Sequence, residues 1–341
     1  MNLTEVNEED FCTQSSNFSC FETASLTAVD VLMYSAAAAV VLLTVYGNLL
    51  VIISICHFKQ LHTPTNLLLL SLAVADLLVG ITVMPFYFIY AIQSRWCFGA
   101  VCCTIFNVNS VFLSCVSIYN VAFIAVDRYF ALHNPFLYST KMTVNSTLII
   151  ISLLWLYSLI YNLILVYFNG LIAPRTEHPM CAEHCAFAIN GIWLVVDLFI
   201  VFVAPFMTII IMYLKIFVIA KRHANNIRCV QEQHHSKGTK KINYSLASET
   251  KAAKTVGILV SAFLLCLVPY YLTVIIFMGT REPSVFFTAT DLTTLVFINS
   301  SINPIIYALF YSWFQKCFKL ILTLRICKPG SSLITVILKD R

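Results

Sequence analysis

The sequence predicts an all-α membrane protein, in which a bundle of seven transmembrane helices is followed by an amphipathic helix at the inner leaflet. Hydrophobic residues make up 60% of the chain and charged residues only 11%, with a mean hydropathy of +0.85. This composition excludes a soluble domain. Backbone groups in lipid must be satisfied within each segment, so each apolar run of spanning length is expected to be a helix. These runs lie at residues 31–56, 66–92, 100–126, 145–168, 191–214, 255–278 and 288–312.

The distribution of basic residues predicts the orientation of the bundle. The first thirty residues contain acids but neither Lys nor Arg, whereas basic residues are dense in 215–254 and 316–341. Lys and Arg favour the cytoplasmic side, so we expect the N-terminus outside, where Asn2 and Asn17 are candidate glycosylation sites. The net charge of +5 follows from this bias and does not indicate nucleic-acid binding. The expected regions are an extracellular tail (1–30), the transmembrane bundle (31–312), and the amphipathic helix with the cytoplasmic tail (313–341).

Most spans carry a polar or proline marker. The first contains a lone amide, Asn48, which is expected to hydrogen-bond to another helix. The second holds Asp76 near its middle, and Pro85 is expected to kink that helix. The markers of the other spans are Asp127-Arg128-Tyr129 at the end of the third, Trp155 in the fourth, Pro205 in the fifth, Phe263 and Pro269 in the sixth, and NSSINPIIY (299–307) in the seventh.

Together these motifs resemble the rhodopsin-like class of G-protein-coupled receptors over essentially the whole chain. A narrower resemblance lies in NSSINPIIYALFYSWFQKCFK at 299–319, which is similar to the trace amine-associated receptors. After it, FQKCFKLILTL alternates basic and apolar residues, as a helix lying along the inner leaflet does. The resemblance implies a plasma-membrane receptor that is not itself an enzyme and that activates a heterotrimeric G protein.

The same resemblance implies two disulfide bridges on the outer side. The bridge shared by the class ties the start of span three to the second outer loop, and here it is expected between Cys103 and Cys185. The family often adds a bridge from the N-terminal tail to the same loop. Cys181 is the expected loop partner, with Cys20 favoured slightly over Cys12 in the tail.

A single acid in the fifth span, Asp197, carries the functional prediction. A carboxylate inside an otherwise apolar span is costly unless a partner compensates it. Receptors for biogenic amines hold the amine on an acid of span three, but the matching residue here is Ser110. Asp197 lies eight residues before Pro205, about two turns, which predicts that both face the ligand cavity. Some fish trace amine-associated receptors resemble this arrangement, which implies that Asp197 binds the ammonium group of a small ligand in reversed orientation.

Other interpretations of the acid remain open. In one, Asp197 is structural, bonded to hydroxyl groups of neighbouring helices, and the ligand is not an amine. In another, Asp291 at the start of span seven is the anchor, although acids in a first helical turn are favoured by the helix dipole alone. The remaining pocket wall implied by the class pattern comprises Ser110, Val111, Ser114, Val201, Tyr270, Tyr271, Thr293 and Phe297. Aromatic faces near an ammonium add roughly 0.5–2 kcal/mol each.

The class pattern also implies a cofactor site in the middle of the bundle. A polar cluster able to hold a sodium ion is expected from Asp76, Ser117, Asn299, Ser300 and Asn303. The alternative is a protonated Asp76 in a water-filled hydrogen-bond network. No other cofactor is expected.

Signalling residues follow from the resemblance at the cytoplasmic end. Arg128 is expected to pair with Glu249 at the inner end of span six, and rupture of this pair would admit the G protein. The usual Trp two residues before the span-six proline is replaced by Leu267, so activation is expected to pass through other residues or basal activity to change. The residues implied in transmission are Asp127, Tyr129, Ile118, Pro205, Phe263, Tyr213 and Tyr307.

The leading hypothesis is a chemosensory receptor, in an olfactory setting, that binds a protonated amine and activates a stimulatory G protein. The second hypothesis keeps the receptor fold but gives it a non-amine ligand. A third, an ion channel or proton-coupled transporter using Asp76 and Asp197, is disfavoured by the Asp-Arg-Tyr and NPxxY motifs.

Overall fold

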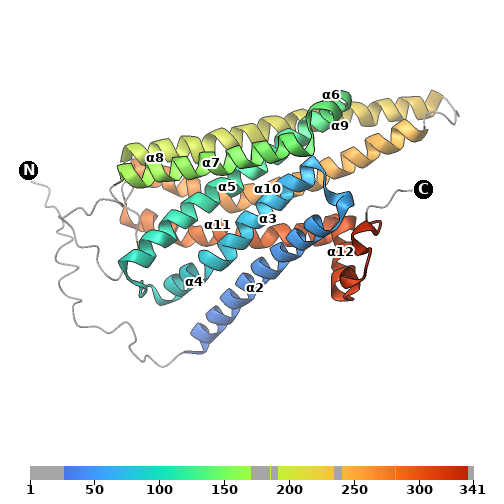
Figure 1. The fold of residues 1–341 in the computed structure, drawn as a ribbon. Helices are drawn as coiled ribbons and strands as arrows, with labels where there is room; N and C mark the ends of the chain where they lie inside the picture. The colour runs from blue at the N-terminus through green and yellow to red at the C-terminus, as the bar shows by residue number, and fades with distance from the viewer. Residues whose placement is uncertain (1–26, 170–184, 186–190, 234–239, 281, 337–341) are drawn as a thin grey trace, which may run out of the picture.

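The computed structural model describes residues 27–169, 185, 191–233, 240–280 and 282–336. Within them, seven helices are long and apolar enough to cross a membrane. They lie lengthwise beside one another, with α6 and α12 at one end and α4 and α8 at the other (Figure 1). The helices are α2 (Ala28–His57), α3 (Pro64–Thr82), α4 (Met84–Gln93), α5 (Gly99–His133), α6 (Pro135–Lys141), α7 (Val144–Phe168), α8 (Gly191–Asp197), α9 (Ala204–Gln233), α10 (Lys240–Thr280), α11 (Pro283–Phe310) and α12 (Ser312–Leu322).

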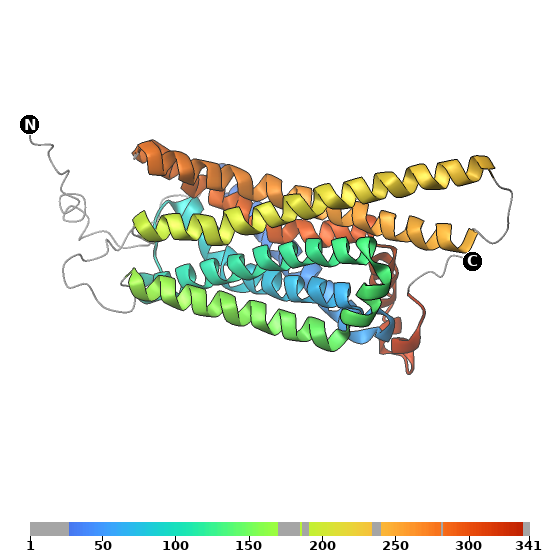
Figure 2. The ribbon, with the colours of Figure 1, turned by 90° about the horizontal axis from the view of Figure 1, so that it is seen from above.

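The second span is broken where the sequence predicts a kink. Helix α3 ends at Thr82 and α4 begins at Met84, with Pro85 in the first turn of α4. A proline has no N–H to donate and its ring clashes with the preceding turn, so it is accommodated best in the first turn of a helix. The kink prediction is therefore confirmed. At the opposite end, α9 and α10 extend beyond the other helices (Figure 2).

A proline and a glycine set the contact between the first and seventh spans. Pro304 lacks an N–H, which leaves the carbonyl of Ser300 without its helical donor. Asn48 Nδ2 donates to that carbonyl at 3.0 Å and to Thr44 O at 2.9 Å, which confirms the expected interhelical bond. Gly47 permits the close approach, because a Cβ there would lie 2.6 Å from Pro304 Cβ. Gly47 and Asn48 thus pack closely against α11 at Ser300 and Pro304.

The fifth span is not a regular α-helix. Between α8 and α9, residues Leu198–Val203 form a π-helical segment, in which the N–H of Ala204 bonds to the carbonyl of Phe199. The carbonyl of Ile200 then has no helical donor, because the next candidate is the imide nitrogen of Pro205. Tyr119 of α5 donates its hydroxyl proton to this carbonyl at 2.9 Å. The π turn takes up an extra residue, so counting at 3.6 residues per turn from Pro205 misplaces the residues before it.

The C-terminal segment folds back on the turn between the first two spans. Helix α12 is followed by two short 3₁₀ turns, Arg325–Cys327 and Ser331–Leu333. His57 Nε2 lies 2.9 Å from Ser331 Oγ, and the N–H of Val336 donates to Gln60 Oε1 at 3.2 Å. Val336 is 0% exposed. The expected amphipathic helix is confirmed, and the docking of the residues after it was not foreseen from the sequence.

Candidate functional site

Asp197 is the last residue of α8, directly before the π segment, and its side chain is half-buried. Tyr161 of α7 donates its hydroxyl proton to Oδ1 of Asp197 at 2.7 Å. Tyr161 is only 6% exposed, so this bond is shielded from solvent. Within the described part of the chain, no donor reaches Oδ2. Among the residues that the structure describes, one carboxylate oxygen is therefore engaged and the other has no hydrogen-bond donor.

The surroundings of Asp197 are rich in aromatic rings. Tyr270 and Tyr271 of α10 lie within electrostatic range of its carboxylate, as does Cys115 of α5. Tyr271 is stacked on Phe202 with ring centroids 4.2 Å apart, and it meets Tyr270 edge-on at 5.1 Å. The acid of the fifth span thus faces groups from the third, fourth and sixth spans. Ring faces in such a position attract an ammonium ion.

The third span supplies no charge at this level. Ser110, which stands where biogenic amine receptors have their acid, donates its hydroxyl to the carbonyl of Phe106 in its own helix. Val111 and Ser114 are half-buried. The rival acid, Asp291, is exposed in the N-terminal part of α11. Its carboxylate reaches Tyr87 of α4 electrostatically, and no interaction with Asp197 is recorded among the described residues.

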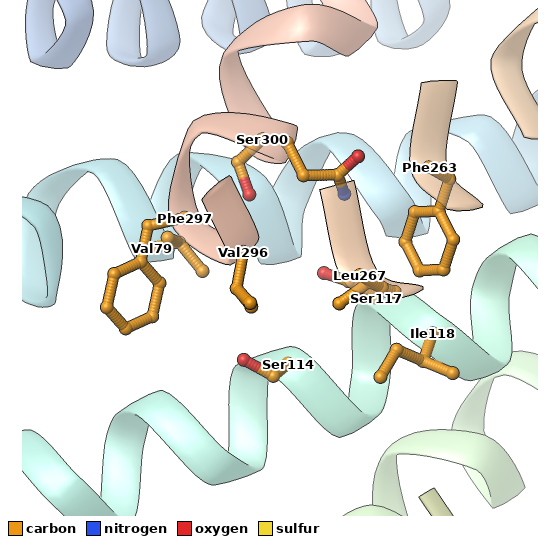
Figure 3. Close-up of a pocket in the computed structure, with 10 residues that line it drawn as sticks. Val79, Ser114, Ser117, Ile118, Phe263, Leu267, Val296, Phe297 and Ser300 are labelled. Atoms are coloured by element: carbon orange, nitrogen blue, oxygen red, sulfur yellow. The ribbon is translucent and has the colours of Figure 1, made fainter. Parts of the chain in front are cut away.

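A small cavity of about 20 Å³ lies between α5, α10 and α11 (Figure 3), enough for about one water molecule. Two predicted wall residues, Ser114 and Phe297, line it, together with Leu267, which replaces the usual Trp. Asp197 is not among the residues that line it. The full lining is Val79, Ser114, Ser117, Ile118, Phe263, Leu267, Val296, Phe297, Asn299 and Ser300. Some of the residues predicted to line the ligand pocket, such as Tyr270 and Tyr271, therefore lie near Asp197, whereas Ser114 and Phe297 line this cavity.

The other predicted wall residues are placed as follows. Val201 is buried in the π segment, one helical turn from Asp197. Thr293 donates to the carbonyl of Ala289 at 3.1 Å within α11. Among the hydrogen bonds of the described residues, neither side chain bonds to Asp197, and neither lines the small cavity.

Three of the four predicted partners of Asp76 are hydrogen-bonded to it, namely Ser117, Ser300 and Asn303. Asp76 is 0% exposed. Its Oδ1 accepts hydrogen bonds from Ser300 Oγ at 2.8 Å and Ser117 Oγ at 3.3 Å, and its Oδ2 accepts one from Asn303 Nδ2 at 2.6 Å. Asn299 lines the adjoining cavity, and its Oδ1 is buried with no hydrogen-bond partner in the described part of the chain. A buried carboxylate beside an unsatisfied amide oxygen fits a hard cation.

Near the C-terminal end of α5, Asp127 is the centre of a hydrogen-bond network. It forms a salt bridge with Arg128 at 2.7 Å, and Thr65 Oγ1 and Tyr138 Oη each donate to it at 2.7 Å. Arg128 also donates to Thr65. Burial, with the charge of Asp127, raises the pKa of Tyr138 to about 12. The side chain of Glu249 lies outside the described residues, so its expected pairing with Arg128 remains a prediction.

The residues expected to transmit activation lie between the small cavity and the C-terminal end of α5. Ile118 and Phe263 are buried and both line the small cavity, and Pro205 follows the π segment. The hydroxyl groups of Tyr213 and Tyr307 are buried without a hydrogen-bond partner in the part of the chain described. Tyr129, beside Arg128, stacks on His133, with Lys215 5.3 Å above its ring.

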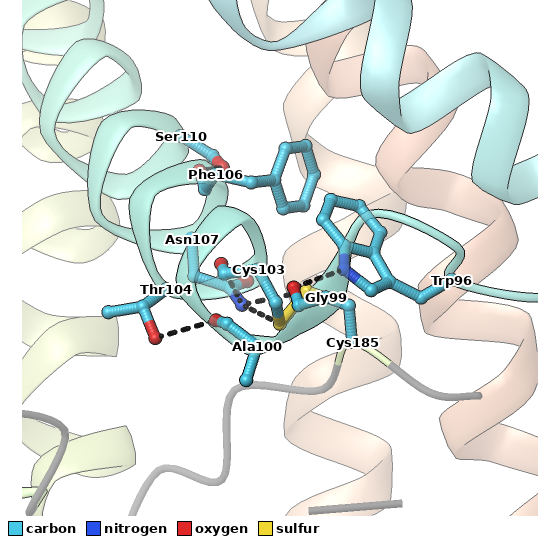
Figure 4. The surroundings of a disulfide bond; sticks show 9 residues. All are labelled: Trp96, Gly99, Ala100, Cys103, Thr104, Phe106, Asn107, Ser110 and Cys185. Atoms are coloured by element: carbon cyan, nitrogen blue, oxygen red, sulfur yellow. Dashed lines mark hydrogen bonds between the residues drawn. A yellow bond between two sulfur atoms is a disulfide. The ribbon is translucent and has the colours of Figure 1, made fainter. Parts of the chain in front are cut away.

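The predicted bridge between Cys103 and Cys185 is present, with an S–S distance of 2.02 Å (Figure 4), which confirms the pairing. Asn107 Nδ2 lies 3.2 Å from Cys185 Sγ and donates to the carbonyl of Cys103 at 3.0 Å. Cys97 is disulfide-bonded as well, and its partner is not among the other described cysteines. The sequence places Cys97 in an outer loop, but no pairing was predicted for it.

Several predicted sites fall outside the described residues. They are the tail-to-loop bridge of Cys20 or Cys12 with Cys181, and the glycosylation sites Asn2 and Asn17. Sequence reasoning also missed Tyr161. Its position in the fourth span is visible in the sequence, but only the fold brings it to Asp197.

Comparison with known proteins gives the same scaffold. The family "7 transmembrane receptor (rhodopsin family)" matches residues 47–307. "Trace amine-associated receptor 13c" of Danio rerio is 37% identical over 333 residues, covering 96% of both chains. "Trace amine-associated receptor 8" of Homo sapiens is 38% identical over 334 residues, with 96% of both chains covered. "Trace amine-associated receptor 8a" of Rattus norvegicus is 38% identical over 335 residues, covering 95% of this chain and 96% of its own.

Proposed function

Because this chain belongs to the rhodopsin family of seven-transmembrane receptors and is related to the trace amine-associated receptors, we propose that it senses small protonated amines. Asp197 is the counter-ion for the ligand's ammonium group. The observation that carries this proposal is the state of its carboxylate, which has one oxygen held by Tyr161 and the other without a donor in the described part of the chain. The setting is olfactory, and the chain lies in the plasma membrane with its N-terminus outside.

Electrostatics favour a cationic ligand over a neutral one. An ionised carboxylate inside a span is costly unless a positive charge or hydrogen bonds compensate it, and the single hydroxyl of Tyr161 compensates it only in part. Lys and Arg are absent from Gly191–Asp197 and from the π segment. A ligand ammonium therefore completes the site. The nearby rings of Tyr270 and Tyr271 add cation–π attraction to the carboxylate's charge.

The ligand lies in reversed orientation relative to amines held on the third span. Ser110 is already hydrogen-bonded within its own helix and carries no charge. The ammonium therefore docks against the fifth span, and the apolar part of the ligand extends toward α5 and α11. There the side chains of Val111, Ser114 and Phe297 provide its wall.

The central polar cluster would hold a sodium ion through Asp76, Ser117, Ser300 and Asn299. The unsatisfied Oδ1 of Asn299 and the adjoining cavity support this assignment. When bound, the ion supplies a positive charge that neutralises Asp76 in the middle of the bundle. The residues themselves hold Asp76 in place through three hydrogen bonds.

Ligand binding is coupled to a stimulatory heterotrimeric G protein at the inner end. Arg128, held there by Asp127, is the residue released on activation. Leu267 replaces the usual bulky residue at the floor of the pocket, so the movement of α10 passes through Phe263 and Tyr270.

The test of amine anchoring is Asp197→Asn, which keeps the shape and the acceptor for Tyr161 but removes the charge. Cells expressing the parent and the variant are exposed to a panel of mono- and diamines, and cyclic AMP is measured alongside surface expression. We expect the variant to reach the surface and to lose the response by at least about a hundredfold in EC50, since a buried charge pair is worth roughly 3 kcal/mol or more. A normal response of Asp197→Asn would refute amine anchoring and favour a non-amine ligand with a structural Asp197.

A further inference from the structure

The π-helical segment of the fifth span decides the direction in which Asp197 points. Asp197 ends α8, and the six residues after it, Leu198–Val203, wind more widely than an α-helix before α9 begins at Ala204. A π turn takes up one residue more than a regular helix over the same length. One residue corresponds to a rotation of about 100° and a rise of about 1.5 Å along the helix axis. In a regular helix, Asp197 would therefore be turned away from Tyr161, its hydrogen-bond partner on α7.

Pro205 has no N–H, so one carbonyl of this span lacks a helical donor in either geometry. In the π geometry the N–H of Ala204 bonds to the carbonyl of Phe199. The carbonyl left over is then that of Ile200, five residues before the proline. In a regular α-helix Ala204 would bond to Ile200, and the carbonyl of Val201 would be left over. The proline alone therefore does not choose between the two geometries.

The choice is made from another helix. Tyr119 of α5 donates its hydroxyl proton to the carbonyl of Ile200 at 2.9 Å. In the π geometry this bond satisfies an acceptor that has no other helical donor. In the regular helix the same carbonyl would already have Ala204 as its donor, so a second bond there would gain less, and Val201 would stay unsatisfied. The hydroxyl of Tyr119 thus favours the π geometry over the regular one.

We infer that Tyr119 is a positioning residue for the amine site, because its hydroxyl holds the π geometry that turns Asp197 toward the ligand. This inference rests on the proposed function, amine sensing through Asp197. The hydroxyl acts on Ile200, three residues after the acid, and needs no contact with the ligand. Without it, a smaller fraction of receptors has Asp197 in the binding direction. Apparent affinity falls in the same proportion, by about tenfold for the loss of one such hydrogen bond.

The π geometry predicts a rescue that a merely structural role of Tyr119 would not give. Deleting one residue from the π segment shortens it to the length of a regular α-turn and keeps Asp197 in its present direction. Phe199 is the residue to delete, because its side chain is 57% exposed. In the shortened chain Ala204 bonds to Ile200, so the hydroxyl of Tyr119 is no longer needed. Tyr119→Phe is therefore expected to impair the full-length chain and to leave the shortened chain unaffected.

The experiment measures cyclic AMP and surface expression in cells that express the parent, Tyr119→Phe, the chain lacking Phe199, or the chain with both changes. The probes are isopentylamine, 2-phenylethylamine, cyclohexylamine and 1,5-diaminopentane. Tyr119→Phe is expected to raise the EC50 of each active amine about tenfold in the full-length chain, and about twofold or less in the chain lacking Phe199. The control is Tyr46→Phe, which removes a hydroxyl from an exposed side chain of α2 and should leave EC50 unchanged.

The outcomes separate the inference from the function on which it rests. If Tyr119→Phe raises EC50 equally in both chains, or has no effect while Asp197→Asn abolishes the response, the inference is wrong and amine sensing stands. A chain lacking Phe199 that reaches the surface but does not respond also overturns it. Should that chain not reach the surface, deletion of Ile200 gives the same shortening, and failure of both deletions refutes the inference. Should Tyr119→Phe itself stay inside the cell, the deletion is expected to restore its surface expression and response, and no restoration refutes the inference. If Asp197→Asn responds like the parent, or no amine acts on the parent, the proposed function fails and the inference with it.

Discussion

Replacement of Gly47 by Ala tests the contact between the first and seventh spans most directly. The new Cβ would lie 2.6 Å from Pro304 Cβ and 2.8 Å from Pro304 Cγ. Carbon atoms prefer separations of at least about 3.5 Å, so α2 and α11 must move apart by about 1 Å. The proline ring cannot rotate out of the way, since it is closed on its own backbone. The strain therefore falls on the helix pair.

The cost can be worked out from the bonds that cross the same interface. A shift of about 1 Å takes the Asn48 Nδ2 to Ser300 O distance of 3.0 Å and the Thr44 to Ser301 hydroxyl distance of 2.7 Å beyond hydrogen-bonding range. Interhelical hydrogen bonds in membranes contribute about 0.6 kcal/mol each on average. Overpacking itself costs about 1–3 kcal/mol. The sum is a destabilisation of about 2–4 kcal/mol.

Thermal unfolding of the purified receptor in detergent measures this effect. The Tm of Gly47→Ala is expected to fall by roughly 5–10 °C. The control is Gly279→Ala, in α10, where no atom lies within 4 Å of the added Cβ. That change should leave Tm unchanged or raise it slightly, because Ala favours a helix over Gly. If Gly47→Ala melts together with the parent and with Gly279→Ala, the close approach of α2 to Pro304 is not what stabilises this interface.

Two further predictions concern single hydroxyl groups. Tyr119→Phe leaves the carbonyl of Ile200 without a donor, because the π turn and Pro205 remove both helical candidates. This substitution should lower the free energy of unfolding by about 1–2 kcal/mol. The control is Tyr46→Phe at an exposed site, and equal melting temperatures of the two variants would contradict the argument. Burial raises the pKa of Tyr138 to about 12 from its ordinary value of 10, so the stability contributed by its bond to Asp127 is complete below pH 10 and lost as pH rises toward about 12. The difference in stability between the parent and Tyr138→Phe should therefore vanish over that interval in alkaline unfolding titrations, and a difference that persists above pH 12 would refute the assignment.

The seven transmembrane helices were predictable because a segment that crosses the lipid bilayer must have a particular length and composition. A span must be apolar and long enough, and an amide such as Asn48 must find a partner on another helix. The polar cluster around Asp76 was implied by the family resemblance, and Ser117, Ser300 and Asn303 hydrogen-bond to Asp76 in the structure, whereas Asn299 does not.

What the sequence did not reveal depends on contacts between helices. Pro205 removes one N–H, but the turn that widens in response is decided by Tyr119 on another helix, which satisfies the carbonyl of Ile200. The regular spacing assumed between Asp197 and Pro205 therefore does not hold. The partner of Asp197 was likewise beyond reach, because several spans offer hydroxyl groups and only the packing of α7 selects Tyr161.

The hydrogen bond between Val336 and Gln60 joins the last described residue to the short turn Lys59–Leu61, which follows the first transmembrane helix. A fluorescent reporter placed directly after Val336 would therefore be held near this turn as well as behind α12. Its distance to a second dye would report displacement of the first span together with that of the seventh. Energy-transfer sensors built on this receptor should therefore carry the reporter in the loop between α9 and α10, where the moving helices of a receptor of this family can be followed separately.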